Sequence, residues 1–342
     1  MNINQNVSLA IHSTMRLGGT ATFLCEVTSR QDVAEAVAWA EARHLPIIMI
    51  GDGSNIVWRD EGFPGLVMVN KILHYEEFAE DELNVYVTIG AGENWDSVVE
   101  RTVKSGLTGV ECLSLVPGTA GATPVQNVGA YGQEIKQTLV SVEAYDMSIK
   151  QFVNIPNEQC NFGYRISRFK VIDHGKFFIT GLTLHLTKAN PTPPFYSTLQ
   201  KYLDEHGIQT FTPAIIREAV IAIRQAKLPD PAKVANNGSF FANPIVDHGT
   251  LTQLLASYPS ITQWPMENGD FKLSAAWLVE NAGFKDFHDG ETGMATWPAQ
   301  SLVFINEHAK NTADLLKFKQ KVIDAVKAKF DITLVQEPEL LP

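Results

Sequence analysis

Residues 117–133, PGTAGATPVQNVGAYGQ, are crowded with small side chains and contain no charge. Glycine lets a backbone approach a ligand closely, and successive N–H groups can then converge on an anion. A tight loop packed for its own sake is the commoner explanation of a single glycine-rich segment. Two further glycine turns favour a ligand instead, because GDGSN at 51–55 follows the apolar run 45–50 and Gly90–Gly92 ends an alternating strand. The three segments together suit a cradle for a diphosphate.

None of these turns fits the commoner nucleotide motifs. The turn at 51–55 lacks the third glycine of a dinucleotide-binding fingerprint, and the chain contains no Gly-Lys-Ser or Gly-Lys-Thr. The pattern therefore indicates a flavin or nucleotide held mainly by backbone groups.

Composition limits the classes of partner. The 342 residues suffice for two or three domains, and the net charge of −11 argues against nucleic acids and anionic membranes as partners. No apolar run reaches the roughly 20 residues that span a bilayer. The N-terminus resembles no secretory signal, so we expect a cytoplasmic protein. Three widely spaced cysteines, Cys25, Cys112 and Cys160, indicate free thiols and no metal site.

Periodicity predicts an α/β start to the chain and a strand-rich middle. Ser29 caps a helix that buries Val33 and Val37, and the run 45–50 fits a buried strand. Val85, Val87 and Ile89 alternate along another strand. Further expected elements are a strand at 182–186, a proline-rich loop at 188–194, helices at 212–226, 274–282 and 313–330, and a terminal strand at 332–335. Thr212 is the expected N-cap of the helix at 212–226, with Pro213 at its first position.

Four polar clusters interrupt apolar surroundings, at 162–170, 227–231, 236–244 and 337–339. The first holds three aromatics and three cations, a composition that suits an anionic ligand. In the second, prolines fix a turn that could aim Lys227 at a phosphate, although the local evidence alone favours a lysine placed at a helix C-terminus. The third places Ser239 in a tight loop without the flanking glycines of a serine hydrolase. The fourth is a pair of carboxylates at a chain end, which by itself is weak evidence for a catalytic site.

Taken together, these segments resemble the bacterial UDP-N-acetylenolpyruvoylglucosamine reductases, flavoenzymes of peptidoglycan precursor synthesis. The resemblance runs from STMRLGG at 13–19 to EPE at 337–339, nearly the whole chain. Its most specific segments occur in order: GDGSN (51–55), PGTAG (117–121), QNVGAYG (126–132), YRIS (164–167), KLPDP (227–231) and GSFFANP (238–244).

The resemblance implies an α+β fold. A two-part FAD-binding domain of the vanillyl-alcohol-oxidase (PCMH) type would be joined by a smaller α/β substrate-binding domain. The implied boundaries are 1–75 with 331–342 for the first FAD subdomain, 76–211 for the second, and 212–330 for the substrate domain. It also implies non-covalent FAD, NADPH as electron donor, a nucleotide-sugar substrate and a monomer.

The implied chemistry assigns three catalytic residues. Hydride adds to the methylene carbon of an enolpyruvyl ether, so negative charge develops at the α-carbon and spreads into the carboxylate. Arg165 and Glu337 match the pair that stabilises this charge, and Ser239 matches the proton donor. A guanidinium suits a carboxylate, whereas Glu337 helps only when protonated or when it orients a donor.

The remaining implied sites bind cofactor and substrate. Tyr196 places the chain with the longer family form, which folds a loop over the diphosphate. The matched cofactor positions are Gly51, Gly53, Ser54, Asn55, Pro117, Gly118, Thr119, Gly121, Ala122, Gln126, Asn127, Gly129 and Tyr131. The matched substrate positions are Tyr164, Tyr196, Lys227, Asn243 and Gln300.

Two departures and two alternatives accompany the resemblance. Many members have a glycine where Leu115 stands, and often a histidine within the stretch 295–299. One alternative is an FAD-dependent oxidase of the same fold, whose flavin is often tethered through His or Cys; His44 and Cys112 lie just outside the cofactor turns. The other is a nucleotide-sugar binding protein without turnover, which the presence of Arg165, Ser239 and Glu337 disfavours.

Overall fold

The computed structural model describes residues 1–342, and its contacts group into two compact units. Unit 1 comprises residues 1–7, 21–52 and 63–226, and unit 2 comprises residues 8–20, 53–62 and 227–342. The three-part division expected at residues 76 and 212 stays a prediction.

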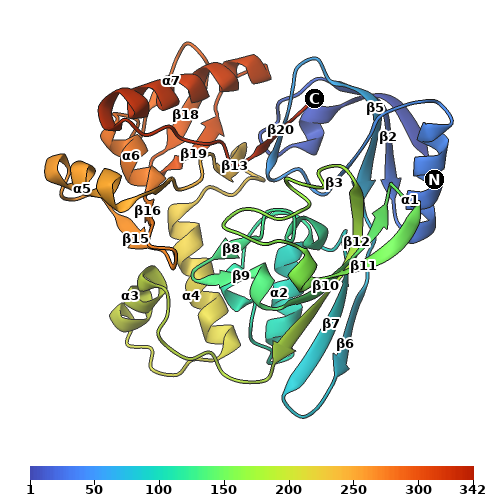
Figure 1. The fold of residues 1–342 in the computed structure, drawn as a ribbon, viewed down its shortest axis with the longest axis horizontal. Coiled ribbons are helices and arrows are strands. Elements are labelled where there is room, and N and C mark those ends of the chain that lie inside the picture. The colour runs from blue at the N-terminus through green and yellow to red at the C-terminus, as the bar shows by residue number, and fades with distance from the viewer. The chain divides into compact units, whose positions relative to one another are not determined.

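The first sheet of unit 1 has the strand order β1-β2-β5-β3. Figure 1 labels its strands β2, β3 and β5. Its strands are β1 (Ile3–Ser8), β2 (Thr20–Val27), β3 (Ile47–Ile50) and β5 (Phe63–Asn70). β2 and β3 both run parallel to β5. Helix α1 (Arg30–Glu41) connects β2 to β3 and begins as expected, because the Ser29 side chain accepts a hydrogen bond from the Asp32 amide. Its buried residues are Val33, Ala36, Val37 and Ala40.

The expectation of a buried strand at 45–50 is wrong in one respect. β3 is an edge strand, and of its four residues only Ile50 is buried. An apolar run of this length does not by itself distinguish a central strand from an edge strand.

The second sheet of unit 1 is antiparallel, with the order β11-β10-β12-β7-β6. Its strands are β6 (Tyr75–Ala79), β7 (Asn84–Gly90), β10 (Leu139–Asp146), β11 (Gln151–Pro156) and β12 (Phe177–Thr187). Alternate residues of β7 and β12 face a core that helix α2 (Trp95–Lys104) covers. The alternation expected at 85–89 and at 182–186 is therefore confirmed.

Two helices, a hairpin and several short turns complete unit 1. They are α3 (Ser197–Glu205), α4 (Pro213–Lys227), the strands β8 (Gly129–Ala130) and β9 (Gln133–Glu134), and 3₁₀ turns at Glu111–Leu113, Ala120–Ala122, Ile135–Gln137 and Asn157–Gln159. The expected cap of α4 is confirmed, since the Ile215 amide donates to Thr212 Oγ1 at 3.2 Å.

Unit 2 contains small sheets with helices packed on them. The strands are β13 (Asn236–Ser239), β17 (His288–Asp289), β18 (Met294–Trp297) and β19 (Gln300–Asn306); β14 (Ile245–Val246), β15 (Gln263–Pro265) and β16 (Phe271–Leu273); and β4 (Ile56–Trp58) with β20 (Glu339–Leu341). The helices are α5 (His248–Ser257), α6 (Ala275–Asn281) and α7 (Thr312–Phe330), with a 3₁₀ turn at Leu9–His12. At its aromatic centre, Phe240 stacks on Phe304, and Phe304 meets Phe318 edge to face. No helix in either unit is long and apolar enough to cross a membrane.

The expected terminal strand at 332–335 is wrong. Ile332 and Leu334 are buried, which explains the strand-like alternation, but residues 332–335 form no strand. The strand lies further along, at β20, and runs parallel to β4. Burial of alternate side chains does not require a partner strand, so the pattern alone misplaced the element.

Candidate active site

Three glycine turns meet within unit 1. A Cβ atom built on Gly51 would lie 2.3 Å from Thr119 Oγ1, and one built on Gly121 would lie 2.5 Å from the Cβ of Ala91. The 117–121 segment is also bonded to the turn after β7, because Gly121 N donates to Ala91 O at 2.9 Å and Ala120 N donates to Glu93 O at 2.8 Å. Only residues without side chains at 51 and 121 allow this approach.

The second half of the glycine-rich segment is held by Asn127. Its side chain donates to Glu134 Oε2 and to Gly163 O, both at 3.0 Å, while its Oδ1 accepts from the Lys136 amide at 3.2 Å. Asn127 is fully buried and has a left-handed backbone, with φ of 47°. In this structure its side chain shapes the loop.

Arg165 lies against the same segment. It occupies a tight turn closed by the Gly163–Ile166 bridge, with φ of 57°. Its Nη2 donates to Gly129 O at 2.8 Å, and its guanidinium lies 5.2 Å from the centre of the Tyr164 ring. A Cβ on Gly129 would come within 3.3 Å of Arg165 Nη1, so glycine gives the guanidinium room. The structure therefore brings Tyr164 and Arg165 to the predicted cofactor segment.

Tyr196 packs on Tyr131 in unit 1. The two rings meet edge to face with centres 6.1 Å apart. Tyr196 directly precedes α3 and follows the cis Pro193–Pro194 peptide. Burial raises the pKa of both phenols, so both hydroxyls remain protonated, able to donate hydrogen bonds.

In unit 2, the segments of Ser239 and Glu337 adjoin. Glu337 N donates to Phe240 O at 3.0 Å, and Ala242 N donates to Val335 O at 3.0 Å. Ser239 is the last residue of β13 and pairs with Val303 of β19. Two predicted catalytic residues far apart in the sequence are thus brought to neighbouring backbone positions.

Residues 53–55 of the glycine turn at 51–55 belong to unit 2. The Ser54 carbonyl accepts from Asn237 Nδ2 at 3.3 Å, and the same Nδ2 lies 3.1 Å from Thr14 Oγ1, to which it donates. A Cβ on Gly53 would lie 2.1 Å from His12 O, and Thr14 N donates to Gly53 O at 3.1 Å. The turn is therefore fixed next to the Ser239 segment.

The other predicted substrate residues of unit 2 are Asn243, Gln300 and Lys227. Asn243 Oδ1 accepts from Ala275 N at 2.9 Å at the start of α6, so this oxygen is already used. Gln300 is the first residue of β19, where it pairs with Trp297. Lys227 is the last residue of α4, consistent with either interpretation of its turn.

Comparison with known proteins agrees with this geometry. Residues 21–148 match the FAD binding domain family, and residues 230–341 match the family described as UDP-N-acetylenolpyruvoylglucosamine reductase, C-terminal domain. The UDP-N-acetylenolpyruvoylglucosamine reductase of Ralstonia nicotianae is 37% identical over 342 residues, covering 99% of both chains. That of Cupriavidus pinatubonensis is 38% identical over 330 residues, covering 96% of both. This chain belongs to the UDP-N-acetylenolpyruvoylglucosamine reductase family.

A solved member of the reductase family shares the fold. The crystal structure of the Thermus caldophilus reductase aligns over 100% of both chains with a TM-score of 0.69, at 21% sequence identity. The expected FAD-binding fold with a second domain is confirmed, and so is FAD as cofactor. The roles of individual site residues stay predictions.

The residues of unit 1 fit FAD. Glycine at 51 and 121 lets the turns pack closely, with Thr119 and Ala91 beside them, and residues 21–148 match the FAD binding domain family. The buried Nε of Arg224 has no hydrogen-bond partner, which leaves a cationic donor near this segment. Arg224 Nη2 donates to Leu115 O at 3.2 Å, just before Pro117.

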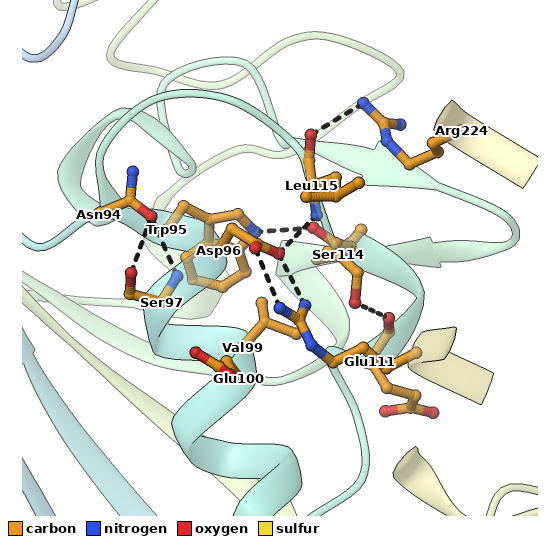
Figure 2. A network of polar contacts seen from close by, with 12 residues as sticks. Asn94, Trp95, Asp96, Ser97, Val99, Glu100, Glu111, Ser114, Leu115 and Arg224 are labelled. Atoms are coloured by element: carbon orange, nitrogen blue, oxygen red, sulfur yellow. Dashed lines mark hydrogen bonds and ion pairs between the residues drawn. The ribbon is translucent and has the colours of Figure 1, made fainter. Parts of the chain in front are cut away.

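Three charged residues near the predicted site were missed by the sequence analysis. Asp96 and Arg224 contact the backbone of Leu115 (Figure 2), and Lys319 Nζ donates to Gln336 Oε1 at 3.2 Å, beside Glu337 in the chain. Burial, with the charge of Arg59, lowers the pKa of Lys319. All three lie on helices outside the motifs, so only the tertiary structure reveals them.

Proposed function

We propose that this chain reduces UDP-N-acetylglucosamine enolpyruvate to UDP-N-acetylmuramate, with NADPH as electron donor. The observation that carries the proposal is the meeting of three glycine turns in a member of this reductase family. The turns at 51–55 and 117–121 would hold FAD, which would supply the hydride chemistry between NADPH and the methylene carbon of the enolpyruvyl group. A proton then adds to the α-carbon, so the substrate gains two hydrogens across its double bond.

The chain's own residues would handle the charge and the proton. Arg165 supplies a fixed guanidinium for the carboxylate into which the developing negative charge spreads. Ser239 donates the proton to the α-carbon. A serine hydroxyl is a weak acid, so it needs a neighbour that relays or stabilises the proton. Glu337, on the backbone segment bonded to that of Ser239, would stabilise the developing charge together with Arg165, as a protonated acid or by orienting a donor.

The test of this function is optical. The purified protein should be yellow, NADPH should bleach it under anaerobic conditions, and the enolpyruvyl sugar nucleotide should restore the colour. Bleaching without recolouring would contradict the proposed substrate.

We expect the same preparation to release intact FAD on acid denaturation. The structure disfavours a tether through Cys112, because burial and the charge of Glu111 raise the pKa of this thiol and the thiolate is the nucleophile. Flavin that stays attached to the denatured chain would favour the oxidase alternative instead.

Tyr196 and Lys227 are proposed to bind the nucleotide diphosphate, remote from the reacting carbons. Tyr196→Ala or Lys227→Ala should raise the dissociation constant of the substrate roughly tenfold to a hundredfold, since a charged hydrogen bond contributes about 1.5–3 kcal/mol. In each variant, the rate of flavin reduction by NADPH is measured as the internal control for the change in substrate affinity.

Two variants separate contact from packing. Tyr196→Phe keeps the ring that packs on Tyr131 and removes only the hydroxyl. Lys233→Ala removes an exposed lysine whose Nζ lies 3.9 Å from Asp230, and it should bind substrate normally. Unchanged affinity in both alanine variants would remove these residues from the substrate site.

We further propose that the protein works as a monomer in the cytoplasm. The free, buried cysteines support this location, as does a substrate that is a precursor nucleotide. The partners expected are the nucleotide sugar and NADPH.

A further inference from the structure

Leu115 has a backbone conformation that suits glycine. Its φ is 55°, in the left-handed region, which residues with a Cβ rarely adopt. The side chain is only half-buried and belongs to none of the core clusters. Packing of the leucine side chain therefore does not explain the conformation.

Both polar groups of the Leu115 backbone are held by charged side chains (Figure 2). The amide donates to Asp96 Oδ1 at 2.6 Å, and the carbonyl accepts from Arg224 Nη2 at 3.2 Å. Asp96 is itself oriented by Arg217, whose Nη1 and Nη2 donate to its two oxygens at 2.7 Å and 3.0 Å. We call Asp96, Arg217 and Arg224 the Leu115 clamp.

The charge on Asp96 is maintained in this environment. Burial raises the pKa of its carboxyl, but the hydrogen bonds from Arg217 and the Leu115 amide outweigh burial and bring the pKa below its ordinary value. An ionised carboxylate gives a charge-assisted bond to the amide, which is stronger than a bond between neutral groups.

Helix α2 also holds the chain on both sides of Leu115. Trp95 Nε1 donates to Leu113 O at 3.1 Å, and Trp95 N donates to Gly118 O at 3.0 Å. Asp96 is the next residue of the same helix. Its bond to Leu115 thus fixes the conformation at the point where the chain enters the 117–121 turn.

We propose that Asp96, oriented by Arg217, is a positioning residue for FAD. It holds Leu115 in the left-handed conformation and so presets the 117–121 segment in a chain that has leucine at this position. This inference rests on the proposed role of that segment in binding FAD.

The test is a double-mutant comparison of FAD affinity, measured by quenching of flavin fluorescence on titration of the apoprotein. Asp96→Asn should raise the dissociation constant of FAD about tenfold, the size expected for one charge-assisted hydrogen bond. Leu115→Gly alone should change it less than about twofold. Asp96→Asn combined with Leu115→Gly should bind within about threefold of wild type, because glycine adopts this conformation without support.

Controls match each substitution. His44 has φ of 54° and lies exposed in unit 1, so His44→Gly relieves a similar conformation elsewhere and should not restore FAD binding to Asp96→Asn. Glu100→Gln removes a carboxylate from the same helix, where Glu100 pairs with Lys104, and should bind FAD normally. If Asp96→Asn does not fold, Arg217→Lys replaces it, since lysine keeps the charge but cannot hold both oxygens.

Two outcomes would overturn the inference while the wild type binds FAD. One is normal FAD affinity in Asp96→Asn, and the other is equal weakening with and without Leu115→Gly, which would mean that Asp96 acts only through the stability of the fold. A wild-type protein that binds no FAD would instead overturn the proposed function and, with it, this inference.

Discussion

Ser239→Ala is expected to slow reoxidation of the flavin by the enolpyruvyl substrate about a hundredfold or more. This is the usual scale for the loss of a positioned general acid. Reduction of the flavin by NADPH should remain nearly intact, because that half-reaction needs no protonated carbon. Stopped-flow absorbance of the flavin follows the two half-reactions separately.

Two further variants sharpen this experiment. Ser239→Cys should recover part of the lost rate, because a thiol also donates a proton. Ser301→Ala removes a buried serine on the neighbouring strand β19, whose hydroxyl donates to Glu280 Oε1 at 3.3 Å, and should leave both half-reactions unchanged. If Ser239→Ala slows both half-reactions equally, the substitution has damaged the fold. A normal rate of flavin reoxidation by substrate would exclude Ser239 from the mechanism.

The local elements around the site could be predicted because local physics determines them. Ser29 and Thr212 each cap a helix as expected, since a hydroxyl accepts an N–H that the first helical turn leaves unpaired. Glycine at 51 and 121 allows close packing against Thr119 and Ala91, and the expected approach of this backbone to a ligand stays a prediction. At such positions a single missing Cβ decides what fits, so the sequence carries the information directly.

Long-range pairing could not be predicted in this way. The bond between Glu337 N and Phe240 O joins segments that no periodicity relates, and the resemblance alone suggested their common role. The same limit explains why the terminal strand was misplaced. Its true position at β20 depends on pairing with β4, which lies far away in the sequence.

Leu115 shows a third limit. A non-glycine residue in the left-handed region costs about 1–2 kcal/mol, so propensity alone argues against this conformation. The structure nevertheless has it, because Asp96 and Arg224 bind both backbone groups. Asp96, Arg217 and Arg224 are ordinary helix residues in the sequence, and only the fold brings them to Leu115.

Arg165 gives the second large expected effect. Arg165→Gln should slow the substrate half-reaction by a factor of about 10²–10³, the range for removing one group that stabilises developing negative charge. Arg165→Lys should recover part of this loss, because lysine keeps the charge but not the planar pair of donors. Arg165 also donates to Gly129 O, so FAD affinity and the NADPH half-reaction must be measured in each variant to detect a disturbed loop.

Arg168 provides the matched control, three residues further along the same loop. Its Nε donates to Asp173 Oδ2 at 2.7 Å and its Nη1 to Gln159 O at 3.1 Å, contacts that hold the loop together. Arg168→Gln should therefore lower stability and affect both half-reactions alike. Arg165→Gln should selectively slow the second half-reaction, the reoxidation of the flavin by substrate. If the two variants behave identically, Arg165 only supports the loop, and the charge that develops on the substrate must be stabilised by another group.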